Sequence, residues 1–324
     1  MKARAVGFGL AFALCACASE PPTASQAPAA AQVTRLRVHD GTPLELRPAP
    51  LDERRLRADL AAALIESGLP VGAEAPDVWR LASGLERAWR RAGIDLDALR
   101  IGWEVEIEAE LVYGIAVPDG LAPKATEGTA KAVWSIELRL RPPKSDEKLY
   151  ADVEAADEAP FAGDAAALGP ALEARAAAAT RRAAANIMVR VNALRQPVAA
   201  LIDGLAASDP EVRRASAGRL AMLRSAEAVP AMIGRLATEA DRDVLLRLIG
   251  ALAEIGDDRA VEPLIELADP RDREVLRAVI DALAAMGGQR AGDFFDLLSA
   301  HDDADIRLMV EQARARMRRP QVPQ

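Results

Sequence analysis

The sequence predicts an α+β amino-terminal domain followed by an all-α solenoid of four helical hairpins. In the middle of the chain, apolar and charged residues alternate, which is typical of strands that bury one face. In the last third, one helical pattern recurs around Val212, Val244, Val275 and Ile306, at spacings of 32, 31 and 31 residues. A fixed period of this size indicates stacked helical repeats. The length of 324 residues leaves room for about two such domains.

Residues 1–16 have the features of a bacterial export signal. Two basic residues precede an apolar run that is too short to span a bilayer. The segment Leu14-Cys15-Ala16-Cys17 resembles the lipobox of bacterial lipoproteins. This resemblance implies that Cys17 carries a lipid and becomes the mature amino terminus. Cys15 is the weaker acceptor because the bulky Leu14 precedes it directly.

The next segment, residues 17–32, is rich in Pro, Ala and Ser and has no apolar period, so we expect a flexible tether. Ala18 follows the acceptor cysteine, which in enterobacterial-type sorting implies release to the outer membrane. We therefore expect a lipid-anchored protein of the bacterial cell envelope, in the outer membrane and facing the periplasm. Retention in the inner membrane and a plain secretory signal with incidental cysteines stay open as alternatives.

The strands of the α+β domain, residues 33–195, are predicted by alternation of apolar and polar residues. Three such runs cover residues 103–111, 134–140 and 149–155. Since each run has one apolar face, we expect an antiparallel meander with one buried and one solvated face. Weaker alternation over residues 36–46 predicts one more strand, or a hairpin around Asp40-Gly41.

Charged residues gather on the solvated face of this predicted sheet. The first strand carries Glu104, Glu106, Glu108 and Glu110 on one side. Such a row could be interpreted as a cation site, but residues two apart on a strand lie nearly 7 Å from each other. Arginines of the next strand, Arg139 and Arg141, are expected opposite them. We therefore expect cross-strand ion pairs.

Three helices are expected in the same domain. One covers residues 51–68, with Asp52 as its cap and Gly68 as its stop, and a second covers residues 78–92. A long helix with Pro170 near its start carries an apolar stripe as far as Leu194, and this stripe should cover the apolar face of the sheet. The order of elements resembles the small α+β domain of some envelope lipoproteins, including activators of penicillin-binding proteins.

Residues 196–318 form the predicted solenoid, and residues 319–324 a disordered tail. The motif Ala260-Val261-Glu262-Pro263-Leu264-Ile265 resembles HEAT repeats, in the short variant that bilin-lyase-like proteins also contain. This resemblance implies two antiparallel helices in each unit. An aspartate recurs before each second helix, where it can cap free backbone N–H groups: Asp209, Asp241, Asp272 and Asp303.

In this family the second helices line the concave face of the solenoid, which is where a partner would bind. The resemblance therefore implies contacts from charged side chains on the second helices. These candidates are Arg213, Arg214, Arg219, Arg247, Arg277, Asp281 and Arg307.

The sequence offers no sign of catalysis, and we expect no catalytic residues, metal site or cofactor. The chain has two histidines, His39 and His301, and lacks phosphate-loop, dinucleotide-binding and nucleophile-elbow motifs. A net charge of −8 argues against nucleic acid as a partner, and no small-molecule substrate is expected.

The function that we expect from these patterns is that of a protein-binding scaffold, which holds an unidentified envelope protein through its repeats. The alternative is a regulator of an envelope enzyme. In that case the α+β domain would act on the enzyme, and the repeats would serve as a spacer or second contact.

Overall fold

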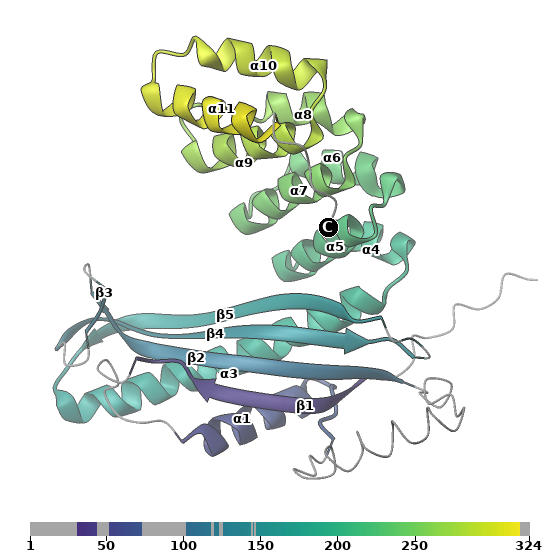
Figure 1. Ribbon diagram of the computed structural model, residues 1–324. Helices are drawn as coiled ribbons and strands as arrows, with labels where there is room; N and C mark the ends of the chain where they lie inside the picture. The colour runs from purple at the N-terminus through teal and green to yellow at the C-terminus, as the bar shows by residue number, and fades with distance from the viewer. Residues whose placement is uncertain are drawn as a thin grey trace, which may run out of the picture.

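A computed structural model describes residues 31–43, 52–72, 102–117, 120–122, 126–143, 145 and 147–317. The predicted export signal, the lipid acceptor Cys17, the helix expected over residues 78–92 and the tail at 319–324 lie outside these residues. The described chain folds into an α+β part followed by a helical solenoid, as the sequence predicts (Figure 1).

The α+β part is built on a sheet in which the path β1-β2-β4-β5 runs from edge to edge, with β3 paired to the end of β2. The strands are β1 (Ala31–Asp40), β2 (Trp103–Val117), β3 (Gly120–Ala122), β4 (Glu127–Arg141) and β5 (Leu149–Ala162). Strands β2, β4 and β5 form the predicted antiparallel meander. Their burial alternates along each strand, as expected for a sheet with one buried face.

The first strand confirms one expectation and corrects another. Of the two alternatives expected over residues 36–46, the structure has the strand, and β1 pairs in parallel with β2. Asp40 ends the strand, and its carboxylate accepts a hydrogen bond from the backbone N–H of Thr42. In addition, β1 already begins at Ala31, which is buried opposite Trp103, so the tether expected through residue 32 must end earlier.

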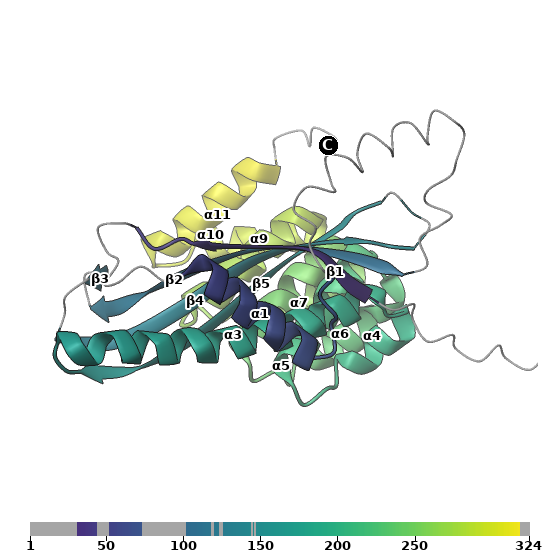
Figure 2. The same cartoon turned by 90° about the horizontal axis from the view of Figure 1, so that it is seen from below.

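Two helices cover the apolar face of the sheet, α1 (Glu53–Glu66) and α3 (Ala165–Arg195). Figure 2, seen from below, shows both in front of the strands. Asp52 caps α1 as predicted, and Gly68 follows its end with a φ of +88°, which favours glycine. The stripe on α3 is buried against the sheet, as expected, and the Trp134 indole N–H donates to the Thr180 hydroxyl over 3.0 Å.

The solenoid consists of four helical hairpins in the described residues. Their helices are α4 (Val198–Gly204) and α5 (Pro210–Met222), α6 (Val229–Leu236) and α7 (Arg242–Ile255), α8 (Val261–Glu266) and α9 (Arg273–Met286), and α10 (Gln289–Ser299) and α11 (Ala304–Met317). Each predicted aspartate accepts backbone N–H groups at the start of a second helix. Because each second helix needs a capping residue at its start, the aspartates recur at a fixed spacing, and the repeat can be recognised in the sequence.

Each part has a hydrophobic core of its own, one between the sheet and its helices and one along the solenoid. The two parts meet where the last turns of α3 pack against α5, and Arg190 of α3 approaches Glu211 of α5 to 3.4 Å. In Figure 1 the solenoid rises from the polar side of the sheet, opposite α1 and α3. This junction places the second helix of the first repeat beside the charged sheet face.

Candidate partner-binding cleft

The polar face of the sheet carries acidic residues that the strand register places side by side. Glu108 lies opposite Glu137, which in turn lies opposite Asp152 on β5. The next row contains Glu110 and Glu154, separated by Ser135. Like charges directly opposite each other destabilise a sheet. An acidic stretch therefore crosses three strands near their centres at a cost to the fold.

Arginines neutralise one end of this face. Arg141 contacts Glu104 at 3.2 Å, and Arg139 contacts Glu137 at 2.7 Å and Glu108 at 3.6 Å. These contacts confirm the expectation of ion pairs between the glutamates and the arginines of β4. The hydrogen bond from Arg139 is the main reason why the pKa of Glu137 lies below its ordinary value.

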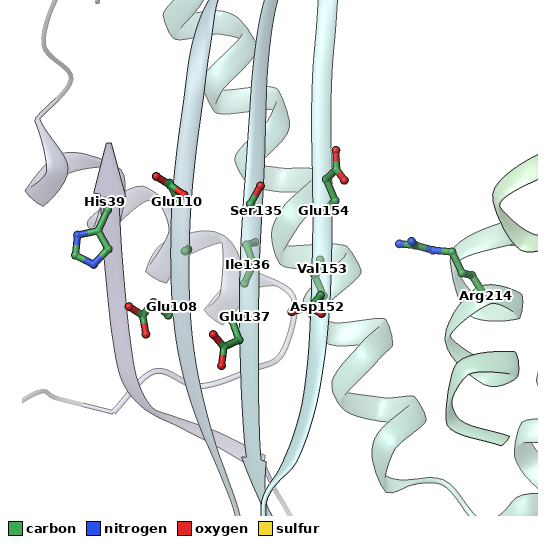
Figure 3. Close-up of a pocket in the computed structure, with 11 residues that line it drawn as sticks. His39, Glu108, Glu110, Ser135, Ile136, Glu137, Asp152, Val153, Glu154 and Arg214 are labelled. Carbon is green, nitrogen blue, oxygen red and sulfur yellow. The ribbon is translucent and has the colours of Figure 1, made fainter. Parts of the chain in front are cut away.

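Three acids toward the other end have no ion pair with any described residue: Glu110, Asp152 and Glu154. They line an open cavity of about 650 Å³ together with His39, Glu108 and Glu137. Arg214, on α5, contributes to the opposite wall. Figure 3 shows its guanidinium pointing from the solenoid toward the acids of β5. The α+β part and the first repeat thus enclose one charged cleft between them.

The cleft continues along the junction between the two parts. Cavities of about 330 Å³ and 260 Å³ adjoin the first, because Arg214 lines all three. The smaller one is lined by Arg190, Arg219 and Arg247 as well. The helix wall is of mixed charge: Glu211, Asp241 and Asp243 line the cavity of about 330 Å³, whereas arginines gather in the smallest cavity.

The structure brings three of the predicted partner-binding residues to this cleft and places the others elsewhere. Arg214, Arg219 and Arg247 line it. Arg277 and Asp281 lie on α9, outside the cavities described above, with Arg277 exposed and Asp281 paired with Arg316.

The prediction that Arg213 contacts a partner is wrong, because this residue is only 6% exposed. Its guanidinium makes two hydrogen bonds of 2.8 Å to Glu239 and also donates to the carbonyl oxygens of Ala207 and Ser208. It therefore holds the turn before α5 and the next repeat together. Burial alone would raise the pKa of Glu239, but hydrogen bonds from Arg213, Arg235 and the backbone N–H of Asp241 outweigh it and hold that pKa far below its usual range.

Arg307 performs the same turn-holding role in the last repeat. It donates to the carbonyl oxygens of His301 and Asp302, at 2.7 Å each. Arg213 and Arg307 both stand four residues after the capping aspartate of their repeat. This shared offset is the sequence signal that could have identified them as structural arginines.

A ladder of ion pairs also joins successive repeats at their capping aspartates. Arg242 makes two hydrogen bonds to Asp272, at 2.6 Å and 2.8 Å, and Arg273 pairs with Asp303 in the following repeat. The hydrogen bonds from Arg242 lower the pKa of Asp272 to about 2. These aspartates thus both cap their helices and fix the spacing of neighbouring hairpins.

Two further properties bear on the chemistry available to the described residues. They contain no group of three or more His, Cys, Asp or Glu side chains arranged to hold a metal ion. Among the helices that the structure describes, none is long and apolar enough to cross a bilayer.

Comparisons with known proteins identify the solenoid. Residues 232–315 match the family model described as HEAT repeats. A segment of 56 residues is 48% identical to the bilin biosynthesis protein PecE of Mastigocladus laminosus. This segment is 17% of this chain and 21% of PecE. Among solved structures, an engineered protein is 21% identical to this chain with a TM-score of 0.28. The match covers 43% of this chain and 73% of the engineered protein. The chain thus spans about a fifth of its curated relative.

The carboxyl-terminal part is accordingly a domain that contains HEAT repeats and is similar over 56 residues to the bilin biosynthesis protein PecE. Sequence reasoning identified this domain and three arginines of the cleft. It did not find the cleft itself, because the sheet acids and Arg214 are brought together by the angle at which α5 packs on α3, and no local pattern encodes that angle.

Proposed function

We propose that this chain is a lipid-anchored protein of the bacterial envelope that holds a partner protein in the cleft between its sheet and its first HEAT repeats. The observation that carries the proposal is the acidic stretch, in which three carboxylates have no ion pair with a described residue and Arg214 points toward those of β5. Natural sheets avoid like charges on neighbouring strands unless something compensates for them. A partner that presents basic side chains to these acids would supply the compensation.

The charges of the cleft also favour a protein over other partners. A nucleic acid or another uniform polyanion would be repelled by Glu110, Asp152 and Glu154. A protein segment can present positive charges to the sheet and a negative charge to the arginines. HEAT repeats commonly provide extended binding surfaces, which agrees with this form of recognition.

We further propose that the chain acts by binding and not by catalysis. The similarity to PecE covers 56 residues of repeats, so it supports a shared repeat scaffold and does not extend the bilin chemistry of that protein to this one. Absorbance titration with a linear tetrapyrrole checks this statement, and tight binding of the pigment would contradict it.

One observation favours the alternative, in which the α+β domain regulates an envelope enzyme. The acidic face of the cleft belongs entirely to β2, β4 and β5 of that domain. The two proposals differ in what they require of the repeats. A scaffold needs both walls of the cleft, whereas a regulator needs the sheet alone.

In-cell cross-linking followed by mass spectrometry tests the proposal. We expect the full chain to capture a defined envelope protein, and we expect Glu110→Gln combined with Glu154→Gln to abolish capture. A matched pair, Glu262→Gln with Glu274→Gln, removes two acids from the solenoid outside the cleft and should leave capture intact. Deleting residues 198–324 should also abolish it; capture that survives this deletion would favour the regulator.

The lipid anchor has its own test. We expect the full chain to incorporate radioactive palmitate in a bacterial host and to fractionate with membranes, and Cys17→Ser to lose both properties. Cys15→Ser serves as the control, because Cys15 is the weaker acceptor. If the label remains in Cys17→Ser and disappears in Cys15→Ser, Cys15 and not Cys17 is the lipid acceptor.

A further inference from the structure

Arginines from three helices converge at the narrow end of the cleft. Arg190 comes from α3, Arg214 and Arg219 from α5, and Arg247 from α7, and all four line the cavity of about 260 Å³. Three carboxylates accompany them: Asp152 of β5 lines the same cavity, Glu211 lies 2.7 Å from Arg214 and 3.4 Å from Arg190, and Glu254 lies 2.9 Å from Arg247. Positive charge therefore exceeds negative charge in this cavity.

Gly218 shows how closely two of these side chains approach each other. A methyl group placed on Gly218 would lie 3.2 Å from Nε of Arg247 and 3.4 Å from a terminal nitrogen of Arg190. Both guanidinium groups thus lie over the same backbone position of α5. Gly218 lies inside α5, and its missing side chain leaves room for the two cations.

The hydrogen bonding of these arginines is incomplete. Nε of Arg190 and Nε of Arg219 are buried and have no hydrogen-bond partner among the described residues, and the side chain of Arg190 is only 12% exposed. Burial lowers the pKa of Arg190 most, and the positive charges of Arg214 and Arg247 lower it further, while Glu211 and Asp152 oppose this shift. Buried donors without acceptors and repelling cations both disfavour the empty cavity.

We infer that this arginine pocket binds a carboxylate of the partner protein, on an acidic side chain that enters while neighbouring basic residues lie along the acidic sheet face. A carboxylate can accept hydrogen bonds from two guanidinium groups at once and would offset their repulsion. The acidic wall beside the pocket favours a segment of mixed charge over a uniform polyanion. This inference rests on the proposed protein-binding function and specifies the chemistry that the cleft recognises.

Two labelled peptides test the inference by fluorescence anisotropy with the full chain. One contains two glutamates followed by lysines that alternate with glycines, and in the other the two glutamates are glutamines. We expect the glutamate peptide to bind at least tenfold more tightly. We expect this preference to vanish in Arg190→Gln combined with Arg247→Gln, and to persist in Arg277→Gln, which removes an exposed arginine outside the pocket.

A second variant retains every charge. Gly218→Ala inserts a methyl group between the two guanidinium groups and should lower the preference for the glutamate peptide several-fold, while circular dichroism shows an unchanged fold. Equal binding of the two peptides, a preference that survives in the double arginine variant, or no binding of either peptide would overturn the inference. If in-cell capture persists in those cases, the proposed function stands and only the arginine pocket is refuted.

Inorganic phosphate distinguishes a specific carboxylate site from a general anion site. We expect phosphate to compete with the glutamate peptide only weakly, because the peptide also contacts the acidic sheet face. Full displacement of the peptide by low millimolar phosphate, with equal loss in Arg277→Gln and in the unmodified chain, would assign the pocket to free phosphate and overturn the carboxylate assignment.

Discussion

Glu239 is a charged residue in the interior of the solenoid that joins groups of the first two repeats. Its side chain is fully buried and accepts hydrogen bonds from Arg213, Arg235 and the backbone of Asp241. Removing one partner of a buried ion pair leaves the other charge without compensation. The pair is thus a fixed part of the first two repeats, in contrast to the unpaired acids of the cleft.

Replacing Glu239 by glutamine should lower the free energy of unfolding of the solenoid by about 3 kcal/mol, because Arg213 then stays buried without its anion. Urea unfolding followed by circular dichroism measures this loss. The control is Glu262→Gln, whose pair with Arg290 is half exposed and should be worth less than about 1 kcal/mol. Equal losses in the two variants would show that burial of the pair does not matter.

The lowered pKa of Glu239 also predicts a pH dependence. Because its folded-state pKa lies below the unfolded value of about 4.3, its contribution is fully present above that pH and is lost as the pH falls toward the folded-state pKa. The stability difference between the unmodified chain and Glu239→Gln should therefore shrink between pH 6 and pH 3. Parallel stability curves over this range would contradict the assignment.

At the scale of elements, one hydrogen bond links the centre of the sheet to its covering helix. The indole N–H of Trp134 on β4 donates to the hydroxyl of Thr180 on α3, which itself donates to the carbonyl oxygen of Ala176. Both side chains are buried. The long helix is therefore held to the sheet by a polar contact as well as by its apolar stripe.

Thr180→Val should leave the Trp134 N–H buried without an acceptor and lower the free energy of unfolding of the α+β part by about 1–3 kcal/mol. Thermal unfolding followed by near-ultraviolet circular dichroism reports on the tryptophan environment. Thr238→Val changes an exposed threonine of the solenoid in the same way and should have little effect. A neutral Thr180 variant would mean that the indole finds another partner.

Elements differ in how far the sequence could predict them. The meander follows from alternation over Trp103 to Leu111 and its two later counterparts, and the hairpins follow from recurring aspartate caps, because these signals are local. The parallel pairing of β1 with β2 depends on residues about 70 positions apart, which no local pattern records. Arg213 and Arg214 are neighbours in sequence, yet one is buried and the other faces the cleft, since their environments are set by other repeats.

For the whole molecule, the two separate cores imply two units that respond separately to core substitutions. Leu248→Ala opens a cavity in the solenoid and should cost about 2–5 kcal/mol. Hydrogen exchange should accelerate in peptides of the solenoid and stay nearly unchanged in the sheet. Leu138→Ala, in the core of the sheet, should give the opposite pattern. Uniform acceleration throughout the chain in both variants would indicate a single cooperative unit.

The parallel pairing of the first strand has a consequence for the order in which the chain is made. Each strand of the meander can pair with a near neighbour soon after it is synthesised, whereas β1 emerges about 70 residues before β2, the strand with which it pairs. Among the described residues, a single bridge from Val33 to Val71 joins β1 to a nearer segment. Until β2 arrives, Val33, Leu36 and Val38 have no sheet to pack on. Of the strands in the described sheet, β1 is therefore the one that waits longest for its partner strand during synthesis.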